Sequence, residues 1–135
     1  MTKKIPQIQR YMTTTPVTIG SQESLQSAKS IMSELNIRHL PVVNDGSILG
    51  VISARDIDFI QGIRGTDLAT QKVKDAMTVE PYIVSAETEL AEVCDVMASQ
   101  KIGSVLVQDN KKLVGIFTWV DALNAMADLM QTRLK

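Results

Sequence analysis

The chain has 135 residues, of which 44% are hydrophobic and 21% are charged, which is ordinary for a folded globular domain. Its 14 basic and 15 acidic residues leave a net charge of −1, which argues against broad nucleic-acid binding. The sequence lacks a run of about 18 apolar residues, so no membrane-spanning helix is expected, and residues 1–6 do not resemble a signal peptide.

The first half of the chain predicts the order strand, helix, strand, strand, helix. A short strand at 17–19 precedes a helix at 25–35, for which Ser24 is a candidate N-cap. Strands at 40–43 and 48–52 flank the hairpin turn 44–47, and a helix follows Ser53 and ends near Gly62 or Gly65. Because Pro41 has no N–H to donate, its part of the strand should lie at a sheet edge or beside a site.

The second half predicts the same order after a polar connector at 62–72. A strand at 82–84 precedes a helix that carries Leu90, Val93 and Met97 and has Thr88 as a candidate cap. Strands at 105–107 and 113–117 form a second hairpin around the turn at 109–112. A last helix then carries apolar residues at 123, 126, 130 and 134.

The two halves are copies of one sequence pattern, aligned without gaps by a shift of 65 residues. Over residues 12–57 the shift gives nine identities, at positions 12, 13, 16, 25, 32, 37, 42, 50 and 56. We therefore predict an α+β fold made of a first motif at 1–65 and a second motif at 66–135. Neither motif can close a core alone, so the two should pack about a pseudo-twofold axis and form two equivalent clefts.

One motif recurs at the end of the last strand in each half. Gly50-Val51-Ile52-Ser53-Ala54-Arg55-Asp56 aligns with Gly115-Ile116-Phe117-Thr118-Trp119-Val120-Asp121. A hydroxyl three residues before an acid at a helix start is a capping box, which needs no ligand. The same geometry can bind a phosphate at the helix N-terminus and a ribose cis-diol at the carboxylate. Both interpretations can hold together.

These motifs, with Ile37-Arg38-His39-Leu40-Pro41-Val42-Val43 and Ile102-Gly103-Ser104-Val105-Leu106-Val107, resemble the CBS domain, named for cystathionine β-synthase. The resemblance covers about residues 12–125 and is to a tandem pair of CBS motifs, a Bateman module. It implies two β-α-β-β-α motifs and a regulatory sensor of adenosyl ligands such as AMP, ADP, ATP or S-adenosylmethionine.

The resemblance also implies which residues bind the ligand. Asp56 and Asp121 would hold ribose hydroxyls, and Ser53 and Thr118 would approach phosphate. The base would be flanked by Ile19, Ile52, Val84 and Phe117, with Pro41 also at the site, while Arg38 and His39 would face phosphate. His39 can equally be a structural histidine, and Arg38 can equally lie on the surface.

The copies differ at positions that predict unequal sites. The second copy has Gly103-Ser104 where the first has Arg38-His39, and Val120 where the first has Arg55, so it lacks those cationic donors. We expect tighter binding of a phosphorylated ligand at one cleft, with a slight preference for the one served by Asp56.

The remaining candidates favour structural interpretations. The single histidine, His39, and the single cysteine, Cys94, leave too few ligands for a zinc site. Cys94 should be a packed thiol, because it lies within a predicted helix, and a lone cysteine suits a reducing, cytoplasmic location. Trp119 could stack on a base, but packing is favoured because it follows Thr118 into the last helix.

The last helix, at 119–134, has apolar residues on more than one face, so it should be buried or shared with a partner. We expect a homodimer through helices that include it, with an unidentified effector protein and no membrane or nucleic acid as partner. A ligand-independent dimerisation or scaffold module is the alternative function. An enzyme is disfavoured, because no nucleophile–base pair, metal set or acid pair has usable spacing.

Overall fold

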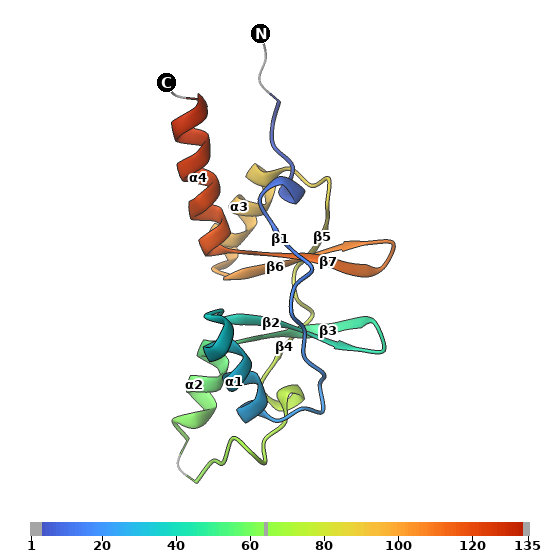
Figure 1. The fold of residues 1–135 in the computed structure, drawn as a ribbon, viewed down its shortest axis with the longest axis vertical. Helices are drawn as coiled ribbons and strands as arrows, with labels where there is room; N and C mark the ends of the chain where they lie inside the picture. The colour runs from blue at the N-terminus through green and yellow to red at the C-terminus, as the bar shows by residue number, and fades with distance from the viewer. Residues whose placement is uncertain (1–3, 64, 134–135) are drawn as a thin grey trace. The chain divides into compact units, whose positions relative to one another are not determined.

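The computed structural model describes residues 4–63 and 65–133, which form two compact units (Figure 1). The central unit is Pro16–Pro81, and the outer unit combines residues up to Thr15 with those from Tyr82 onward. Each unit contains a small sheet and two α-helices, so the α+β prediction is confirmed. No helix within the described ranges has both the length and the apolar character needed to cross a membrane.

The central unit is built on an antiparallel sheet of order β2-β3-β4, with α1 and α2 packed against it. Its elements are α1 (Leu25–Leu35), β2 (His39–Asn44), β3 (Ser47–Ser53), α2 (Ala54–Gln61), the 3₁₀ turn η2 (Val73–Asp75) and β4 (Thr78–Val79). The predicted helix at 25–35 is confirmed, and Ser24 caps it by accepting a hydrogen bond from the Ser27 N–H at 3.0 Å. Its core centres on Leu25, Leu40, Val42 and Ile52, which have no exposed surface.

The outer unit repeats this plan with a sheet of order β1-β7-β6-β5. Its elements are η1 (Ile8–Arg10), β1 (Thr13–Thr14), β5 (Ile83–Ser85), α3 (Leu90–Gln100), β6 (Ser104–Asp109), β7 (Lys112–Thr118) and α4 (Trp119–Arg133). The cap prediction for α3 is wrong: the N-cap is Glu89, and the Thr88 hydroxyl lies 3.1 Å from the Ser85 hydroxyl instead. Leu134, predicted to belong to the last helix, lies outside the described residues.

The segment near the start of each copy joins the sheet of the other copy. Residues 8–14 and 73–79, here called the lead-in segments, are equivalent by the 65-residue shift. Thr13 of β1 pairs with Ile116 in the outer unit, and Thr78 of β4 pairs with Val51 in the central unit. Each lead-in segment therefore completes the sheet that contains the other copy's hairpin.

The glycine of each repeated motif lies where a lead-in segment crosses the last strand. A Cβ built on Gly50 would collide with the Thr78 carbonyl oxygen, and one built on Gly115 would lie 2.5 Å from Met12 Sδ. At Gly50 the close approach is to backbone and needs a residue without a side chain, whereas at Gly115 it is to the side chain of Met12.

The predicted strand at 17–19 is reduced to a single bridge between Ile19 and Val42, whereas its copy β5 has three residues. The Leu106 N–H donates to the Tyr82 carbonyl at 2.9 Å. The equivalent donor in the central unit would be Pro41, which has no N–H. Ile19 still forms two hydrogen bonds with β2. Its N–H donates to the Pro41 carbonyl, and its carbonyl accepts the Val43 N–H, each at 3.0 Å. Pro41 thus lies in β2, at the edge of its sheet, as predicted. Its missing N–H accounts for the shortened strand at 17–19.

Candidate functional site

The junction of β3 and α2 holds the first copy of the repeated motif as a complete capping box. The Ser53 N–H donates to Asp56 Oδ2 at 2.9 Å, and the Asp56 N–H donates to Ser53 Oγ at 3.1 Å. Asp56 is partly buried, and its second carboxylate oxygen, Oδ1, has no hydrogen-bond partner among the described residues. The carboxylate is therefore fixed in direction and keeps one oxygen for further donors.

The junction of β7 and α4 holds the second copy with a different set of bonds. The Thr118 N–H donates to Asp121 Oδ2 at 2.9 Å, and the Thr118 hydroxyl approaches the same oxygen at 3.4 Å. The Thr13 hydroxyl donates to Asp121 Oδ1 at 3.3 Å. Sequence reasoning missed Thr13, because its contact depends on the exchange of the lead-in segments. Both oxygens of Asp121 already have protein donors, unlike those of Asp56.

Arg38, His39 and Arg55, the phosphate-facing candidates of the first copy, lie near its capping box in the fold. His39 pairs with Ser53 across β2 and β3, and the Arg38 carbonyl accepts the Ala54 N–H at 2.8 Å. The side chains of Arg38 and Arg55 are exposed, while that of His39 is partly buried. Burial lowers the pKa of His39 below its usual 6.5, and the positive charge of Arg38 lowers it further, while the negative charge of Asp56 partly opposes the decrease. His39 is therefore neutral at pH 7.

The lowered pKa of His39 predicts a loss of stability in mild acid. The unfolded chain takes up the proton first as the pH falls through 6.5, so the free energy of unfolding should decrease below that pH. Urea unfolding at pH 7.5 and 5.5 would measure the decrease, and His39→Gln should lose less stability over that interval. An equal loss in the wild-type and variant chains would show that other groups cause it.

The apolar candidates for flanking a base lie in the cores of their units. Ile52 and Phe117 have no exposed surface, and Ile19 and Val84 are 5% and 8% exposed. Pro41 is also buried, in β2. Contact between these side chains and a ligand stays a prediction.

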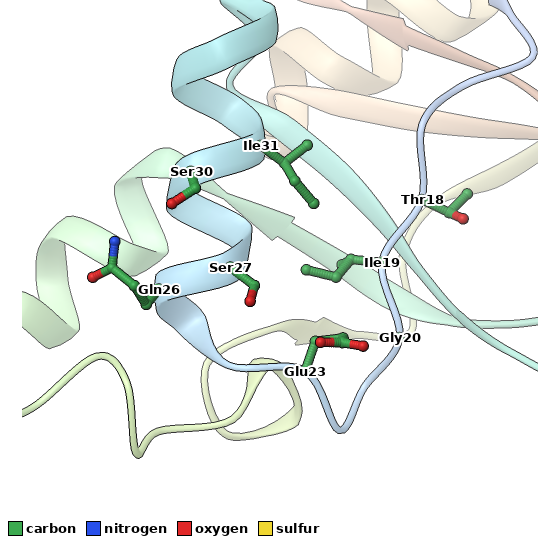
Figure 2. Close-up of a pocket in the computed structure, with 8 residues that line it drawn as sticks. All are labelled: Thr18, Ile19, Gly20, Glu23, Gln26, Ser27, Ser30 and Ile31. Carbon is green, nitrogen blue, oxygen red and sulfur yellow. The ribbon is translucent and has the colours of Figure 1, made fainter.

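A hollow of about 510 Å³ lies within the central unit, between residues 18–20 and α1 (Figure 2). Ile19 extends toward α1, and Ser27 and Ile31 extend from α1 toward it. Glu23 is the single ionisable residue among those that line the hollow. We call this feature the α1 hollow; of the predicted site residues it includes Ile19.

Cys94 is partly buried in α3, and burial followed by the charge of Asp95 raises the pKa of its thiol. A raised pKa keeps the thiol protonated, as expected of a packing residue rather than a nucleophile.

Comparison with known proteins identifies the repeat. The CBS domain profile matches twice, at residues 8–59 and 73–128. The chain is 30% identical over 118 residues to the CBS domain-containing protein YhcV of Bacillus subtilis, covering 87% of this chain and 84% of that protein. It is also 26% identical over 134 residues to the inosine-5'-monophosphate dehydrogenase of Korarchaeum cryptofilum, but it spans only 27% of that enzyme.

Solved structures share the fold. The CBS domain pair of protein MJ0100, crystallised with 5'-methylthioadenosine and S-adenosyl-L-methionine, superposes with a TM-score of 0.84 at 24% identity, covering 93% of this chain and 98% of that one. CBSX2 in complex with AMP gives a TM-score of 0.82 at 23% identity, covering 91% and 97%. With two profile matches in tandem and this architecture, the chain belongs to the CBS domain family and contains a pair of CBS motifs.

Proposed function

We propose that this CBS pair is a regulatory module that binds an adenosyl compound and has no catalytic activity of its own. The observation that carries the proposal is the repeated Ser/Thr-x-x-Asp junction, in which Asp56 is held in a fixed direction with Oδ1 unbonded by the described residues. The adenosyl ligands bound by MJ0100 and CBSX2 support the ligand class. AMP, ADP, ATP and S-adenosylmethionine are the candidates.

In this proposal each carboxylate accepts hydrogen bonds from ribose hydroxyls, and the hydroxyl residue before each helix approaches phosphate. His39, Arg38 and Arg55 add donors for phosphate to the first copy alone. Asp56 is the stronger ribose acceptor, because Thr13 already donates to Asp121. The proposed site comprises Ile19, Arg38, His39, Pro41, Ile52, Ser53, Arg55, Asp56, Val84, Phe117, Thr118 and Asp121, in the clefts that the duplication predicts.

Binding would regulate by favouring one arrangement of the motifs or subunits over another, which requires different affinity for the two arrangements. An effector protein would respond to the favoured arrangement. We place the module in the cytoplasm, in keeping with its single, packed thiol.

A ligand-independent scaffold is the second candidate, and one observation favours it. Both junction carboxylates already bond the N–H of the residue that precedes their helix, so they stabilise the fold without any ligand.

Thermal unfolding separates the two functions. A ligand present at 100 times its dissociation constant stabilises the folded state by about 2.7 kcal/mol, which should raise Tm by roughly 10 °C. We expect such a shift with at least one of AMP, ADP, ATP, S-adenosylmethionine and NAD, and none with CMP, which has phosphate and ribose but no purine. No shift with any of the five would favour the scaffold.

We further propose that α4 joins two copies of the chain. Its exposed apolar face comprises Trp119, Val120, Leu123, Met126 and Met130, each about half exposed. The equivalent residues of the first copy are Ala54, Arg55, Asp58, Gln61 and Gly65. Since that copy folds with small or polar residues there, folding alone does not explain the apolar face.

Light scattering at micromolar concentration should give twice the chain mass. Leu123→Asp with Met126→Gln, which copies Asp58 and Gln61, should give the monomer mass, because it places a charge and an amide in the apolar interface. Ala91→Asp, at an exposed position of α3, is the matched control and should stay dimeric. A wild-type monomer would contradict the proposal.

A further inference from the structure

The last helix of the chain is longer than its counterpart in the first copy. α2 ends at Gln61, whereas α4 continues past the equivalent position to Arg133. The 65-residue shift places Ala127 where the first copy has Gly62, the C-cap of α2, and alanine favours continuation of a helix. Residues 127–133 are therefore an extension of α4 that the first copy lacks.

Two side chains of the first lead-in segment, residues 8–14, hold this extension. The Tyr11 hydroxyl donates a hydrogen bond to Asp128 Oδ2 at 2.6 Å. The Arg10 guanidinium lies 3.8 Å from the same oxygen and 5.4 Å from the centre of the Tyr11 ring. The first copy cannot form these contacts, because its equivalent residues are Asp75, Ala76 and Ile63. The cluster therefore occurs only where the helix is extended.

The same segment also bonds the first turn of α4. The Thr13 hydroxyl donates to Asp121 Oδ1 at 3.3 Å. Its equivalent, Thr78, makes no such bond to Asp56 among the described residues. Asp121 and Asp128 are seven residues apart, so they lie on one face of α4, about 10 Å from each other along the helix. The first lead-in segment thus bonds two carboxylates on that face, and one of them is a proposed ribose acceptor.

The exposed apolar face of α4 lies on the opposite side of the helix. With 3.6 residues per turn, Leu123, Met126 and Met130 point away from the side that carries Asp121 and Asp128. Each of the three is about half exposed, so the first lead-in segment leaves them uncovered. The contacts at the two carboxylates can therefore be removed without changing the face proposed to join two copies.

We propose that Thr13 competes with the ligand for Asp121, and that Tyr11 positions Thr13 to do so. The inference rests on the proposed function, because it takes Asp121 as a ribose acceptor. A ribose hydroxyl that bonds Oδ1 must displace the Thr13 hydroxyl from that oxygen. Tyr11 lies two residues earlier in the same segment, so its bond to Asp128 limits how far Thr13 moves away. Thr13 is thus an inhibitory contact at the second site, and Tyr11 is a positioning residue.

Titration calorimetry of the Asp56→Ala chain isolates the Asp121 site, with AMP and S-adenosylmethionine as separate probes. Adding Thr13→Ala should tighten binding about fivefold, because the ribose no longer displaces a hydroxyl. The matched control is Thr78→Ala in the Asp121→Ala chain, which should leave the affinity of the Asp56 site unchanged. Unchanged affinity with Thr13→Ala would overturn the inference. So would the absence of binding of either probe to Asp56→Ala, with or without Thr13→Ala; the proposed function is judged separately, by binding to Asp121→Ala.

Tyr11→Phe tests the positioning role, because it keeps the ring and removes the hydroxyl that bonds Asp128. In the Asp56→Ala chain it should tighten binding about threefold. Combined with Thr13→Ala it should add nothing further, since Tyr11 acts only through Thr13. In the Asp121→Ala chain it should leave the affinity unchanged, whereas a merely structural role would lower Tm without distinguishing the two sites. No effect, additive effects with Thr13→Ala, or equal effects at both sites would overturn the positioning role.

Discussion

Replacing both junction carboxylates, by Asp56→Ala with Asp121→Ala, should weaken AMP binding at least about 100-fold. A carboxylate that accepts two ribose hydroxyls forms charge-assisted bonds, and alanine offers no acceptor. Titration calorimetry measures the effect, and it also separates the two sites. Asp56→Ala should cost more than Asp121→Ala, because the Thr13 hydroxyl already bonds Asp121 Oδ1 at 3.3 Å.

The loss of AMP affinity in these variants must be distinguished from a loss of folding, because each carboxylate also caps a helix. Losing a cap costs about 1 kcal/mol, which a stable chain tolerates. Asp56→Asn with Asp121→Asn keeps one side-chain oxygen to accept the Ser53 and Thr118 N–H groups, but it removes the charge and replaces the other acceptor oxygen by an NH2 donor. It should retain Tm and still lose affinity. Asp58→Ala with Asp95→Ala removes two exposed charges and serves as the matched control; if it weakened AMP binding equally, the ribose assignment would be wrong.

Gly50→Ala should destabilise the chain by about 3 kcal/mol, whereas Gly115→Ala should cost about 1 kcal/mol or less. A methyl group on Gly50 meets the Thr78 carbonyl, so the backbone of β4 would have to move. On Gly115 it meets the end of the Met12 side chain, which can adopt another rotamer. Urea unfolding of the two variants measures the difference.

Gly62→Ala completes this series as a control. Its Cβ would lie 3.5 Å from the nearest oxygens, and its φ of −73° suits any residue. It should therefore stabilise the chain by about 0.5 kcal/mol through the unfolded state. Similar losses for Gly50→Ala and Gly115→Ala would mean that the close approach of β4 does not constrain the fold.

Local features were predictable because short-range rules determine them. The duplicated pattern predicted both hairpins, and the spacing of Ser53 and Asp56 predicted a capping box that the structure confirms. The Asp45-Gly46 turn has positive φ at both residues, as a two-residue hairpin requires. The cap of α3 was misassigned to Thr88 because threonine is a preferred cap residue, and the sequence pattern alone does not show that the helix begins one position later, after Glu89.

Non-local features were not predictable from either copy alone. The equivalence of Thr13 and Thr78 says that both begin a motif, but it does not say in which sheet each pairs. Gly50 and Gly115 are the one indication in the sequence. Their missing side chains suggest that another segment approaches closely, but they do not identify that segment. The shortened strand at 17–19 could have been predicted, because Pro41 lacks the donor that Leu106 supplies; we noted the missing donor but not its effect on the neighbour.

The exchange of lead-in segments also orders the events of biosynthesis. Every element of the central unit lies before residue 82, so the ribosome delivers that unit as one uninterrupted stretch. The lead-in segment with Ile8 and Thr13 is synthesised before the central unit, but it has no sheet to join until β7 emerges more than 100 residues later. The central unit can thus fold first during translation, and the segments on either side of it meet last.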